Sequence, residues 1–393
     1  MLTLAWLLLI LLALVAVPMA AYLALLTVLS GRCAPPAQAA ATPNFAVVVP
    51  AHDEAAGIAA AIASLRALAW PQHAVRVVVV ADNCSDDTAA IARDAGAQVI
   101  ERHDDRLRGK GYALAFAFEH LLAEGWAQAL VVIDADSEVD AHLLQALAAR
   151  LAVGAEAIQT HYGVTNANAA WRTRLMAIAL GAFHRLRSRA RERLGLSCGI
   201  RGNGWCVTPQ ALQRVPYRAF SLAEDAEFGI DLGLAGLRVH YVDEAEVRAE
   251  MVTGEAAARS QRQRWEHGRG GLIRSRLPRL LKASCSPARR VPLDLACDLL
   301  VLPLSSLVLA SMLLLGLGGA LTTAGADRLA LLPGLFCLLA ATLYVLRGWQ
   351  LSGVGARGAF DLAGAPVYIA WKLLLKLRPH AADKWVRTTR EQR

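Results

Sequence analysis

The sequence lacks the cysteine pattern that marks a disulfide-stapled or zinc-binding protein. Its seven cysteines are odd in number and scattered, with no CxxC pair and no cysteine/histidine spacing that suits a metal. We therefore predict reduced thiols, without a disulfide framework and without zinc. The chain also has no internal repeat and no P-loop, because Gly109-Lys110-Gly111 lacks the required spacing. These absences exclude disulfide scaffolds, zinc modules and P-loop NTPases.

Charged side chains are missing from three long stretches. Met1–Ser30, Leu299–Ala326 and Leu329–Leu346 contain none, and the whole chain is 55% hydrophobic with a mean hydropathy of +0.37. Each stretch is near or above the about 18 apolar residues that indicate a membrane span. A cleaved signal peptide is the alternative for the first stretch. That alternative is disfavoured because the stretch has no basic start and exceeds the about 7–15 apolar residues of a signal core.

Basic residues outnumber acidic ones, 41 to 33, and nearly all of them are arginine. Such an excess can indicate nucleic-acid binding, but arginines beside membrane spans meet anionic lipid headgroups instead, so we expect membrane lipids and no nucleic acid as partners. By the positive-inside rule, residues 32–298 and the C-terminal tail are predicted to be cytoplasmic, and the N-terminus and the Asp327-Arg328 corner external. The flanking basic residues are Arg289, Arg290, Arg347, Arg357, Lys372, Lys376, Arg378 and Lys384.

Composition divides the chain into segments. Gly31–Asn44 is rich in proline and alanine, which is typical of a linker. Ala359–Leu375 contains Pro366 and Lys372, so it is expected to be interfacial or re-entrant rather than spanning. The expected segments are a transmembrane helix (1–30), a linker (31–44), a cytosolic domain (45–254), interfacial helices (255–298), two more transmembrane helices (299–326 and 329–346) and a basic C-terminal segment (347–393).

Short β-branched runs alternate with alanine- and leucine-rich segments of helical spacing in the polar part of the chain. Such alternation, with continuously apolar strands, predicts an α/β domain with a mostly parallel sheet covered on both faces. Ligands bind at the carboxyl ends of the strands in such sheets. The expected strands are Phe45–Val49, Arg76–Val80, Gln98–Ile100, Leu130–Ile133 and Ala157–Thr160, and the expected helices are Gly57–Leu68, Asp87–Ala95, Gly111–Ala123 and Asp140–Leu151.

Two segments after the last of these strands have an unusual composition. Trp171–Arg193 is amphipathic and contains seven arginines. A basic helix of this kind lies on a membrane surface or presents an ordinary solvated face. Gly199–Gly204 is rich in glycine, which is typical of a loop or strand that a ligand or another backbone approaches closely.

Paired carboxylates follow the fourth expected strand. Asp134 and Asp136 are two residues apart at a strand end, so their side chains can point the same way. Carboxylates placed there can hold Mg²⁺ or Mn²⁺ against the oxygens of a pyrophosphate. An isolated Asp-x-Asp is common in turns, but its place after an apolar strand favours a metal site.

Three other polar groups have both a structural and a functional interpretation. In the stretch that begins at Asp82, Ser85 or Asp86 would cap the next helix, but this leaves Asp82 itself unexplained. Lys110 precedes a helix, where its cation either reaches a base or phosphate or is solvated. Glu224-Asp225 would suit a helix start, because carboxylates there meet the positive end of the helix dipole.

The last motif is Gln261-Arg262-Gln263-Arg264-Trp265. Gln261, Arg264 and Trp265 are spaced i, i+3 and i+4, so they share one helix face. A guanidinium can fork onto pyrophosphate oxygens, and an indole offers a flat surface for a sugar ring. Anchoring an interfacial helix is the structural alternative, and both roles are compatible.

In this order, the motifs resemble the signature of membrane-bound family-2 glycosyltransferases, the group that includes cellulose, chitin and hyaluronan synthases. The resemblance covers roughly Phe45 to Gly268 and includes the loop Pro50-Ala51-His52-Asp53-Glu54. It implies a GT-A-type fold and a nucleotide-sugar donor, with UDP favoured. Two positions depart from the family: Asp53 stands where asparagine is usual, and Ala223 where threonine or serine is usual.

The resemblance implies a role for each candidate residue. Asp82 would recognise the base, Asp134 the nucleotide, and Asp225, beside Glu224, would be the general base that deprotonates the acceptor in an inverting transfer. The complete expected site is Pro50, Glu54, Asp82, Lys110, Asp134 and Arg264 for the donor, Gln261 and Trp265 for the acceptor, Asp225 and Glu224 for catalysis, and Asp136 with Asp134 for Mg²⁺ or Mn²⁺.

Two products are compatible with this resemblance. One is a polymer or oligomer of β-linked sugars, and the other is a lipid that receives a single sugar. Three or four membrane helices are too few to form a polysaccharide channel within one chain, so export of a polymer would require an oligomer or an export partner. This favours a lipid acceptor or a short product. A non-catalytic membrane scaffold with a degenerate domain is the alternative of a different class. The intact Asp134, Asp136, Asp225 and Trp265 argue against it.

Overall fold

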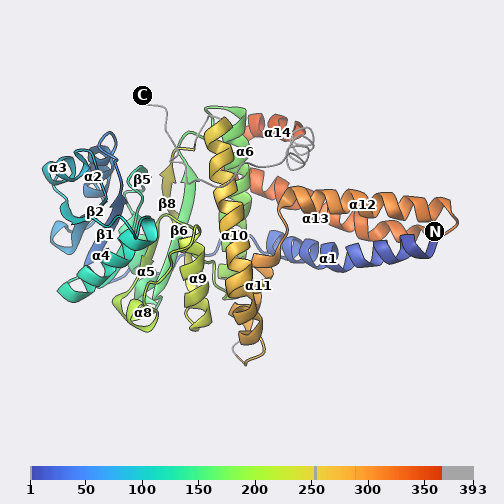
Figure 1. Ribbon diagram of the computed structural model, residues 1–393, viewed down its shortest axis with the longest axis horizontal. Coiled ribbons are helices and arrows are strands. Elements are labelled where there is room, and N and C mark those ends of the chain that lie inside the picture. Colours follow the sequence, from blue (N-terminus) through green and yellow to red (C-terminus); the bar gives the residue numbers. More distant parts are fainter. Residues whose placement is uncertain (1, 252–254, 288, 365–393) are drawn as a thin grey trace.

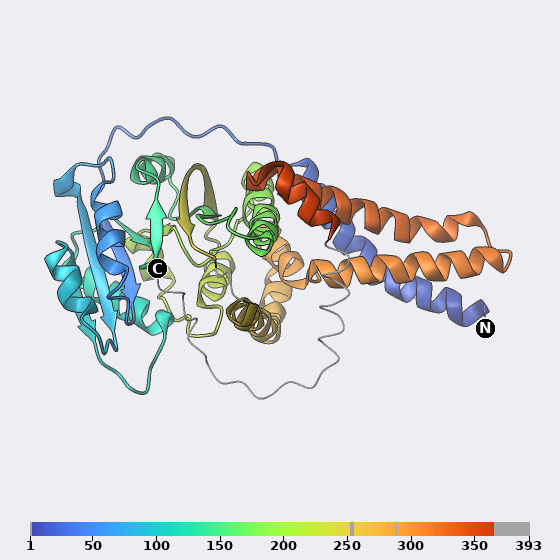
Figure 2. The same ribbon diagram turned by 90° about the horizontal axis from the view of Figure 1, so that it is seen from above.

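The computed structural model has an α/β domain at one end and a bundle of long apolar helices at the other (Figure 1). The structure describes residues 2–251, 255–287 and 289–364, and within 255–263 it describes the backbone alone. Residues 31–44 connect the first helix to the domain without helix or strand (Figure 2). The segment expected to be interfacial at 359–375 lies only partly within the described residues.

Eight strands form one mixed sheet, which is the scaffold of the domain. The first four strands pair only in parallel with one another, whereas β7 runs antiparallel to both of its neighbours. At the far edge, β8 is parallel to β6 and antiparallel to β5. The order across the sheet is β3 (Gln98–Arg102), β2 (Val75–Asp82), β1 (Phe45–Ala51), β4 (Ala129–Val132), β7 (Trp205–Val207), β6 (Ala157–Val164), β8 (Val239–Ala249) and β5 (Ser137–Val139).

The predicted α/β class and all five expected strands are confirmed, but the sheet is less parallel than expected. The difference comes from three strands that the sequence patterns did not reveal. β5 and β7 have three residues each, which is too short for a period-2 pattern to be recognised. β8 carries several charged residues between its buried ones, so it lacks the continuous apolar run of the other strands.

Helices cover both faces of the sheet, because the central strand β1 presents apolar side chains to both faces. Val47 and Val49 of β1 belong to one buried cluster, whereas Ala46 and Val48 belong to the other, because successive side chains point to opposite faces. The first cluster includes residues of α2 and α5, and the second includes residues of α4, α8 and α9. The helices of the domain are α2 (Ile58–Arg66), the 3₁₀ turn η1 (Gln72–Ala74), α3 (Thr88–Asp94), α4 (Lys110–Glu124), α5 (Leu143–Ala152), α8 (Pro209–Arg214) and α9 (Glu224–Leu234).

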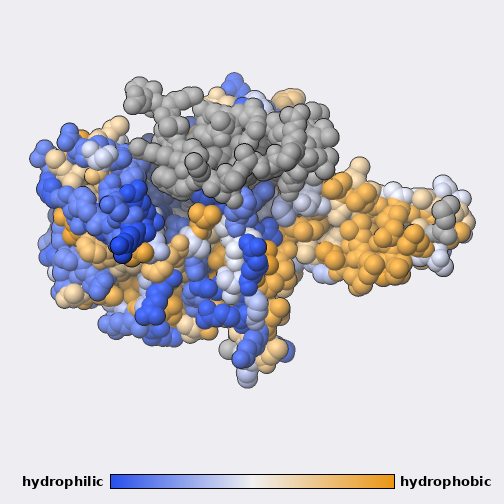
Figure 3. Space-filling view, viewed as in Figure 1, coloured by the Kyte–Doolittle hydropathy of each residue, from blue (hydrophilic) through white to orange (hydrophobic). Residues whose placement is uncertain are grey.

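Three long apolar helices form an arm that projects from the domain (Figures 1 and 2). They share a core to which Leu23, Leu307 and Cys337 contribute, while outward leucines such as Leu14 are exposed and give the arm its hydrophobic surface (Figure 3). By length and composition, each helix can cross a membrane. The arm consists of α1 (Leu2–Val28), α12 (Leu304–Thr323), the 3₁₀ turn η3 (Arg328–Leu331) and α13 (Leu332–Ser352), and α14 (Gly355–Ala363) follows it.

The apolar run that begins at Leu299 does not form a single helix. α11 ends at Leu300, and α12 begins only after Pro303, which is its N-cap residue. A proline at this position has no N–H to donate and suits a helix start better than a helix interior. The second apolar helix is therefore shorter at its start than the predicted segment 299–326.

The arginine-rich segment Trp171–Arg193 packs between the domain and the arm, so the solvated face, one of its two predicted alternatives, is wrong. Arg191 is fully buried and Arg187 nearly so. Both donate to the carboxylate of Asp298, at 2.8 Å in each case, and Arg191 also pairs with Asp294 at 3.0 Å. The sequence showed the basic face but not the distant carboxylates that neutralise it. The helices at this junction are α6 (Trp171–Leu180), the π-helical segment η2 (Gly181–Leu186), α7 (Arg187–Leu194), α10 (Glu255–Ala283) and α11 (Arg290–Leu300).

Candidate active site

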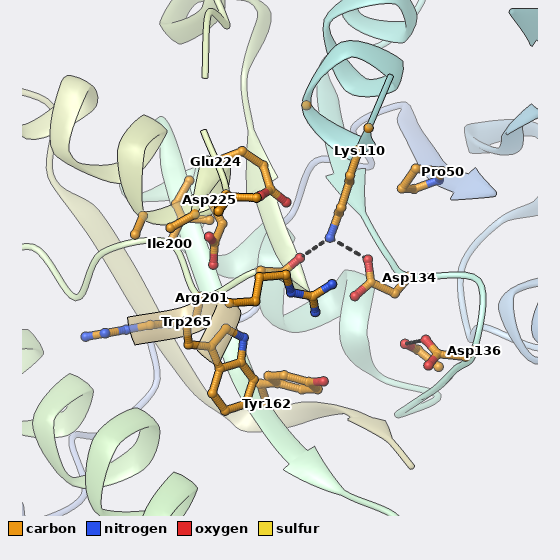
Figure 4. A pocket seen from close by; sticks show the side chains of 18 of the residues that line it. Pro50, Lys110, Asp134, Asp136, Tyr162, Ile200, Arg201, Glu224, Asp225 and Trp265 are labelled. Atoms are coloured by element: carbon orange, nitrogen blue, oxygen red, sulfur yellow. Dashed lines mark hydrogen bonds and ion pairs between the residues drawn. The ribbon is translucent and has the colours of Figure 1, made fainter. Parts of the chain in front are cut away.

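A cleft of about 2220 Å³ runs from the carboxyl ends of the parallel strands to the start of α12. Pro50 lines one end, Asp134 and Asp225 line the middle, and Pro303 lines the other end. Figure 4 shows the middle of the cleft, where the acidic pair at the start of α9 faces the carboxylates that follow β4. The cleft thus joins the edge of the sheet, where ligands bind in this class of fold, to the apolar arm.

Lys110 is the first residue of α4, and its ammonium lies at the centre of this cleft. It donates to Asp134 Oδ1 at 2.5 Å and to the carbonyl oxygen of Gly202 at 2.6 Å (Figure 4). Burial alone would lower the pKa of Lys110, but the carboxylates of Asp134 and Glu224 outweigh that effect and raise it. The solvated alternative for this lysine is therefore wrong, and the cation is held where an anionic ligand can reach it.

The loop after α7 supplies the opposite wall of the cleft. Gly202 has φ +89°, and a Cβ there would lie 3.1 Å from Asp225 Oδ2, so glycine allows the acidic pair to approach this loop. The next residue, Asn203, is buried and accepts a hydrogen bond from the backbone N–H of Asp134 at 3.0 Å. The close approach predicted for the glycine-rich segment is thus observed, and it fixes the position of Asp134.

Asp136 has the chemistry that a divalent cation requires. It lies near Asp134 in the cleft (Figure 4) and accepts a long hydrogen bond of 3.4 Å from Ser137 Oγ. Carboxylate oxygens from one strand end are ligands that suit Mg²⁺ and Mn²⁺, so the residues present fit such an ion.

A second acidic group joins the loops that follow β1 and β2, but it fits such an ion less well. Ligand atoms of Asp53, Cys84 and Asp86 lie within 4.8 Å of one another. Burial raises the pKa of the Cys84 thiol, and a protonated thiol is a poor ligand for a hard cation. Asp53 also accepts a 2.6 Å hydrogen bond from the backbone N–H of Ser85. This group therefore stabilises the loop more readily than it binds Mg²⁺ or Mn²⁺.

Glu224 and Asp225 form the first turn of α9, as the helix-start interpretation expects. Burial and the neighbouring Asp225 carboxylate raise the pKa of Glu224 to about 7. Burial also raises the pKa of Asp225, although backbone N–H groups of the helix start and the Lys110 cation oppose that rise. A carboxylate with a raised pKa is a better proton acceptor than an ordinary one, which suits a general base.

The other residues expected at the donor end also line the cleft. Pro50, Glu54 and Asp82 contribute to its wall. Asp82 is buried and accepts from Arg102 at 2.6 Å, so it is held by an ion pair at the end of β2. Asp53, the position that departs from the family, has φ +52°, a backbone conformation that asparagine and aspartate tolerate better than most residues.

The motif on α10 lies across the cleft from the sheet. Arg264 and Trp265 line the cleft, and 41% of the Trp265 surface is exposed. α10 is held against α9 by Arg276, which donates to Glu227 at 2.6 Å, and by the close contact of Gly268 with Ala223. Gln261 belongs to α10, but its side chain lies outside the described part of the structure.

Several side chains that line the same cleft were not predicted from the sequence, and three of them are close to the proposed site. Arg201 comes from the glycine-rich loop, Tyr162 from β6, and Phe183 from η2. The glycine pattern of the loop predicts a close approach, but it does not indicate where the arginine points. Gln159, a polar residue within a buried strand, was the one available signal. Its side chain accepts from the backbone N–H of Arg201 at 2.8 Å and orders the loop.

Comparison with known proteins places this geometry in a family. Residues 43–268 match the family described as "Glycosyltransferase like family 2". The chain is similar to "Probable glucomannan 4-beta-mannosyltransferase 15" of Arabidopsis thaliana, with 24% identity over 59% of this chain and 45% of the relative. It is also similar to "Beta-monoglucosyldiacylglycerol synthase" of Synechocystis sp., with 28% identity over 58% of this chain and 48% of the relative. The chain spans about half the length of these curated relatives.

A solved structure confirms the fold. The mannosyltransferase PcManGT from Pyrobaculum calidifontis, solved in complex with GDP-Man and Mn²⁺, superposes with a TM-score of 0.55 and 16% sequence identity, covering 93% of this chain and all of that one. At this identity the likeness concerns the GT-A-type fold alone. The family match, in contrast, covers more than half of the chain and includes Asp134, Asp136, Asp225 and Trp265. The chain therefore belongs to the glycosyltransferase like family 2.

Proposed function

We propose that this protein is an inverting hexosyltransferase that moves a sugar from a nucleotide-sugar donor to a lipid or saccharide acceptor at a membrane. The observation that supports this most strongly is one cleft in which a cation, paired carboxylates and a second acidic pair with a raised pKa converge, and which extends to the apolar arm. A scaffold would have no need of this arrangement, because neighbouring carboxylates of like charge repel one another and destabilise a fold.

The donor occupies the sheet end of the cleft in this proposal. Pro50, Glu54 and Asp82 surround the nucleoside, with UDP the favoured nucleotide, and Lys110 and Arg264 neutralise the phosphates. Asp136, with Asp134, would hold Mg²⁺ or Mn²⁺, which supplies charge neutralisation for the leaving diphosphate. Lys110 donates a hydrogen bond to Asp134, so in this proposal the lysine and the metal held by the paired carboxylates contact the same phosphate groups.

Asp225 acts as the general base. Its carboxylate takes the proton of the acceptor hydroxyl as that oxygen bonds to the anomeric carbon, and the bond from that carbon to the diphosphate breaks on the opposite face. Glu224 raises the proton affinity of the pair through like-charge repulsion. A single displacement of this kind inverts the configuration at the anomeric carbon.

The acceptor occupies the end of the cleft next to the arm. Trp265 offers its exposed indole as a stacking surface, and Gln261 lies one turn earlier on the same helix. Because the cleft reaches the first residues of α12, we favour a single sugar added to a lipid over a polymer. A polymer would need an oligomer or an export partner in addition to the three helices, within the described residues, that are long enough to span a membrane.

The metal requirement tests the proposed function. Purified protein supplied with UDP-sugars and Mn²⁺ should release UDP, and Asp136→Ala should lower that rate by about a hundredfold because a ligand to the ion is lost. Asp105→Ala, which alters an exposed aspartate outside the carboxylate pair, is the matched control and should be unchanged. Full activity of Asp136→Ala in excess chelator would exclude this metal site.

Trp265→Ala should impair acceptor use more than donor binding. Stacked aromatic contacts contribute about 0.5–1.5 kcal/mol beyond burial, so the acceptor KM should rise roughly 2- to 12-fold. Trp265→Phe should retain part of the stacking surface and show a smaller rise. Calorimetry with UDP should give the same affinity for all three proteins. Equal loss of UDP binding and of transfer in Trp265→Ala would place this indole in the donor site instead.

We also propose that the domain is cytoplasmic, in a multi-pass protein of the cell (inner) membrane, with the turn between α12 and α13 outside. A cysteine introduced at Ala324 and the native, exposed Cys285 can report on the two sides, in a background that lacks the other native cysteines. An impermeant thiol reagent added to intact cells should label position 324 and not Cys285. The reverse labelling would mean that the orientation is inverted.

A further inference from the structure

The cleft contains a buried guanidinium, that of Arg201, which the proposed catalysis does not use. Only 9% of the Arg201 side chain is exposed. Within the part of the chain that the structure describes, its Nε and Nη2 atoms have no hydrogen-bond partner. Arg201 lines the cleft, and Figure 4 shows its guanidinium extending into it. A buried cation without hydrogen-bond partners is unfavourable unless a ligand supplies them.

The nearest carboxylate does not satisfy this arginine. Asp298 Oδ2 lies 3.8 Å from Arg201 Nη2, which is an ion pair without a hydrogen bond. The other oxygen of Asp298 already accepts from Arg187 and Arg191 at 2.8 Å each. With Asp294 included, three arginines share two carboxylates at this junction, so the cluster retains an excess positive charge. That excess favours an anionic ligand.

The surroundings of Arg201 define the rest of the ligand. On one side its guanidinium lies 4.4 Å from the ring centre of Phe183. The cleft continues past this point to the apolar residues Leu302, Pro303 and Leu304, where α12 begins. On the other side, the next residue of the loop, Gly202, lies against the Asp225 carboxylate at the start of α9. A ligand that fills this space has an anionic group near Arg201, an apolar part along α12 and a group within reach of Asp225.

We propose that Arg201 binds the phosphate of an amphiphilic acceptor, with the acceptor hydroxyl at Asp225 and the acyl chains against the start of α12. This inference rests on the proposed function, because it names the class of acceptor for that same site. Arg201 is a binding residue for the acceptor, whereas the donor phosphates lie at Lys110 and the strand-end carboxylates. A lipid headgroup and a soluble phosphate ester share the required phosphate, and only the lipid has the apolar part.

Three probes separate these requirements. Phosphatidylglycerol has a hydroxyl, a phosphate and acyl chains, diacylglycerol lacks the phosphate, and glycerol phosphate lacks the chains. Each is added to the purified full-length protein in detergent, and its apparent Kd is obtained from the shift in unfolding temperature. Phosphatidylglycerol should bind at least about tenfold more tightly than either of the others. In Arg201→Gln its Kd should rise roughly 10- to 100-fold, since hydrogen bonds to a charged phosphate are lost.

The controls distinguish this inference from the proposed function. Arg201→Lys should recover part of the affinity, and Arg185→Gln, which alters an arginine paired with Asp243 at 2.9 Å, should bind like the unaltered protein. UDP-sugar hydrolysis with Mn²⁺ should persist in Arg201→Gln, and its absence from the unaltered protein would count against the proposed function instead. Equal binding of diacylglycerol and phosphatidylglycerol, or unchanged binding in Arg201→Gln, would overturn the phosphate site. Equal binding of glycerol phosphate would overturn the lipid assignment.

Discussion

Replacing Asp225 with asparagine is expected to lower the rate of sugar transfer by about 10²- to 10⁴-fold, the usual contribution of a general base. Asparagine has nearly the same shape and fits against Gly202, but it cannot accept the proton of the acceptor hydroxyl. Nucleotide affinity should be unchanged, because the donor is held at the other side of the cleft. Transfer rates and calorimetric UDP binding, measured on the same preparation, test this separation. A transfer rate near that of the unaltered protein would remove Asp225 from its proposed role.

The pH dependence of transfer provides a second test of the acidic pair. Burial and the Asp225 carboxylate raise the pKa of Glu224 to about 7, so protons bind the pair as the pH falls through that value. A proton on Glu224 removes the neighbouring negative charge that raises the proton affinity of Asp225, so the general base becomes weaker and transfer should decline below about pH 7. In Asp225→Asn the like-charge repulsion is gone, so the pKa of Glu224 should decrease. A rate that is constant from about pH 5 to about pH 8 would contradict this account.

Asp298→Ala is expected to destabilise the folded protein by about 3–5 kcal/mol. Three arginines surround this carboxylate, and removing one partner of a buried ion-pair cluster leaves uncompensated charge. Burial by itself would raise the pKa of Asp298, but the surrounding guanidinium groups lower it well below its usual range. The aspartate therefore stays charged at neutral pH, and its contribution to stability is lost only in strong acid, as the pH falls through that low pKa.

A matched surface pair gives the comparison. Asp105 pairs with Arg108 at 2.5 Å on an exposed loop, and exposed ion pairs contribute only about 0–1 kcal/mol. Asp105→Ala should therefore unfold at nearly the same temperature as the unaltered protein, whereas Asp298→Ala should unfold far below it. Thermal unfolding in detergent, followed for both variants, measures the difference. Similar unfolding temperatures would mean that the junction does not depend on this carboxylate.

The parts of the fold that were predictable are those in which a local pattern determines the structure. The continuous apolar strand at Phe45–Ala51 and the polar residues that follow such strands indicated the sheet and its ligand-binding edge. The charge-free stretches indicated the apolar helices of the arm. Each of these signals depends on a few neighbouring residues, so one sequence is sufficient to detect it.

The features that were missed depend on contacts between residues far apart in the chain. The arginines of α7 form a regular basic pattern in the sequence. They can be buried only because Asp298 of α11 lies beside them and neutralises their charge. Lys110 likewise could not be distinguished from a solvated lysine until Asp134 and Gly202 were placed beside it. The orientation of Arg201 is set by the loop that Gln159 orders, and no spacing rule describes such a contact.

The Tyr22 hydroxyl in α1 donates to Asp294 at 2.8 Å and accepts from Arg191 at 2.6 Å. The first of these contacts joins residues 272 positions apart. Nearly the whole domain lies between them in the chain, so α1 can form this contact only after the domain has brought Asp294 close to it. Contacts of such long range are formed late, because closing a long loop has an entropic cost. We therefore expect the packing of the arm and the assembly of the cleft to be completed together, so that the domain and the arm unfold as one unit.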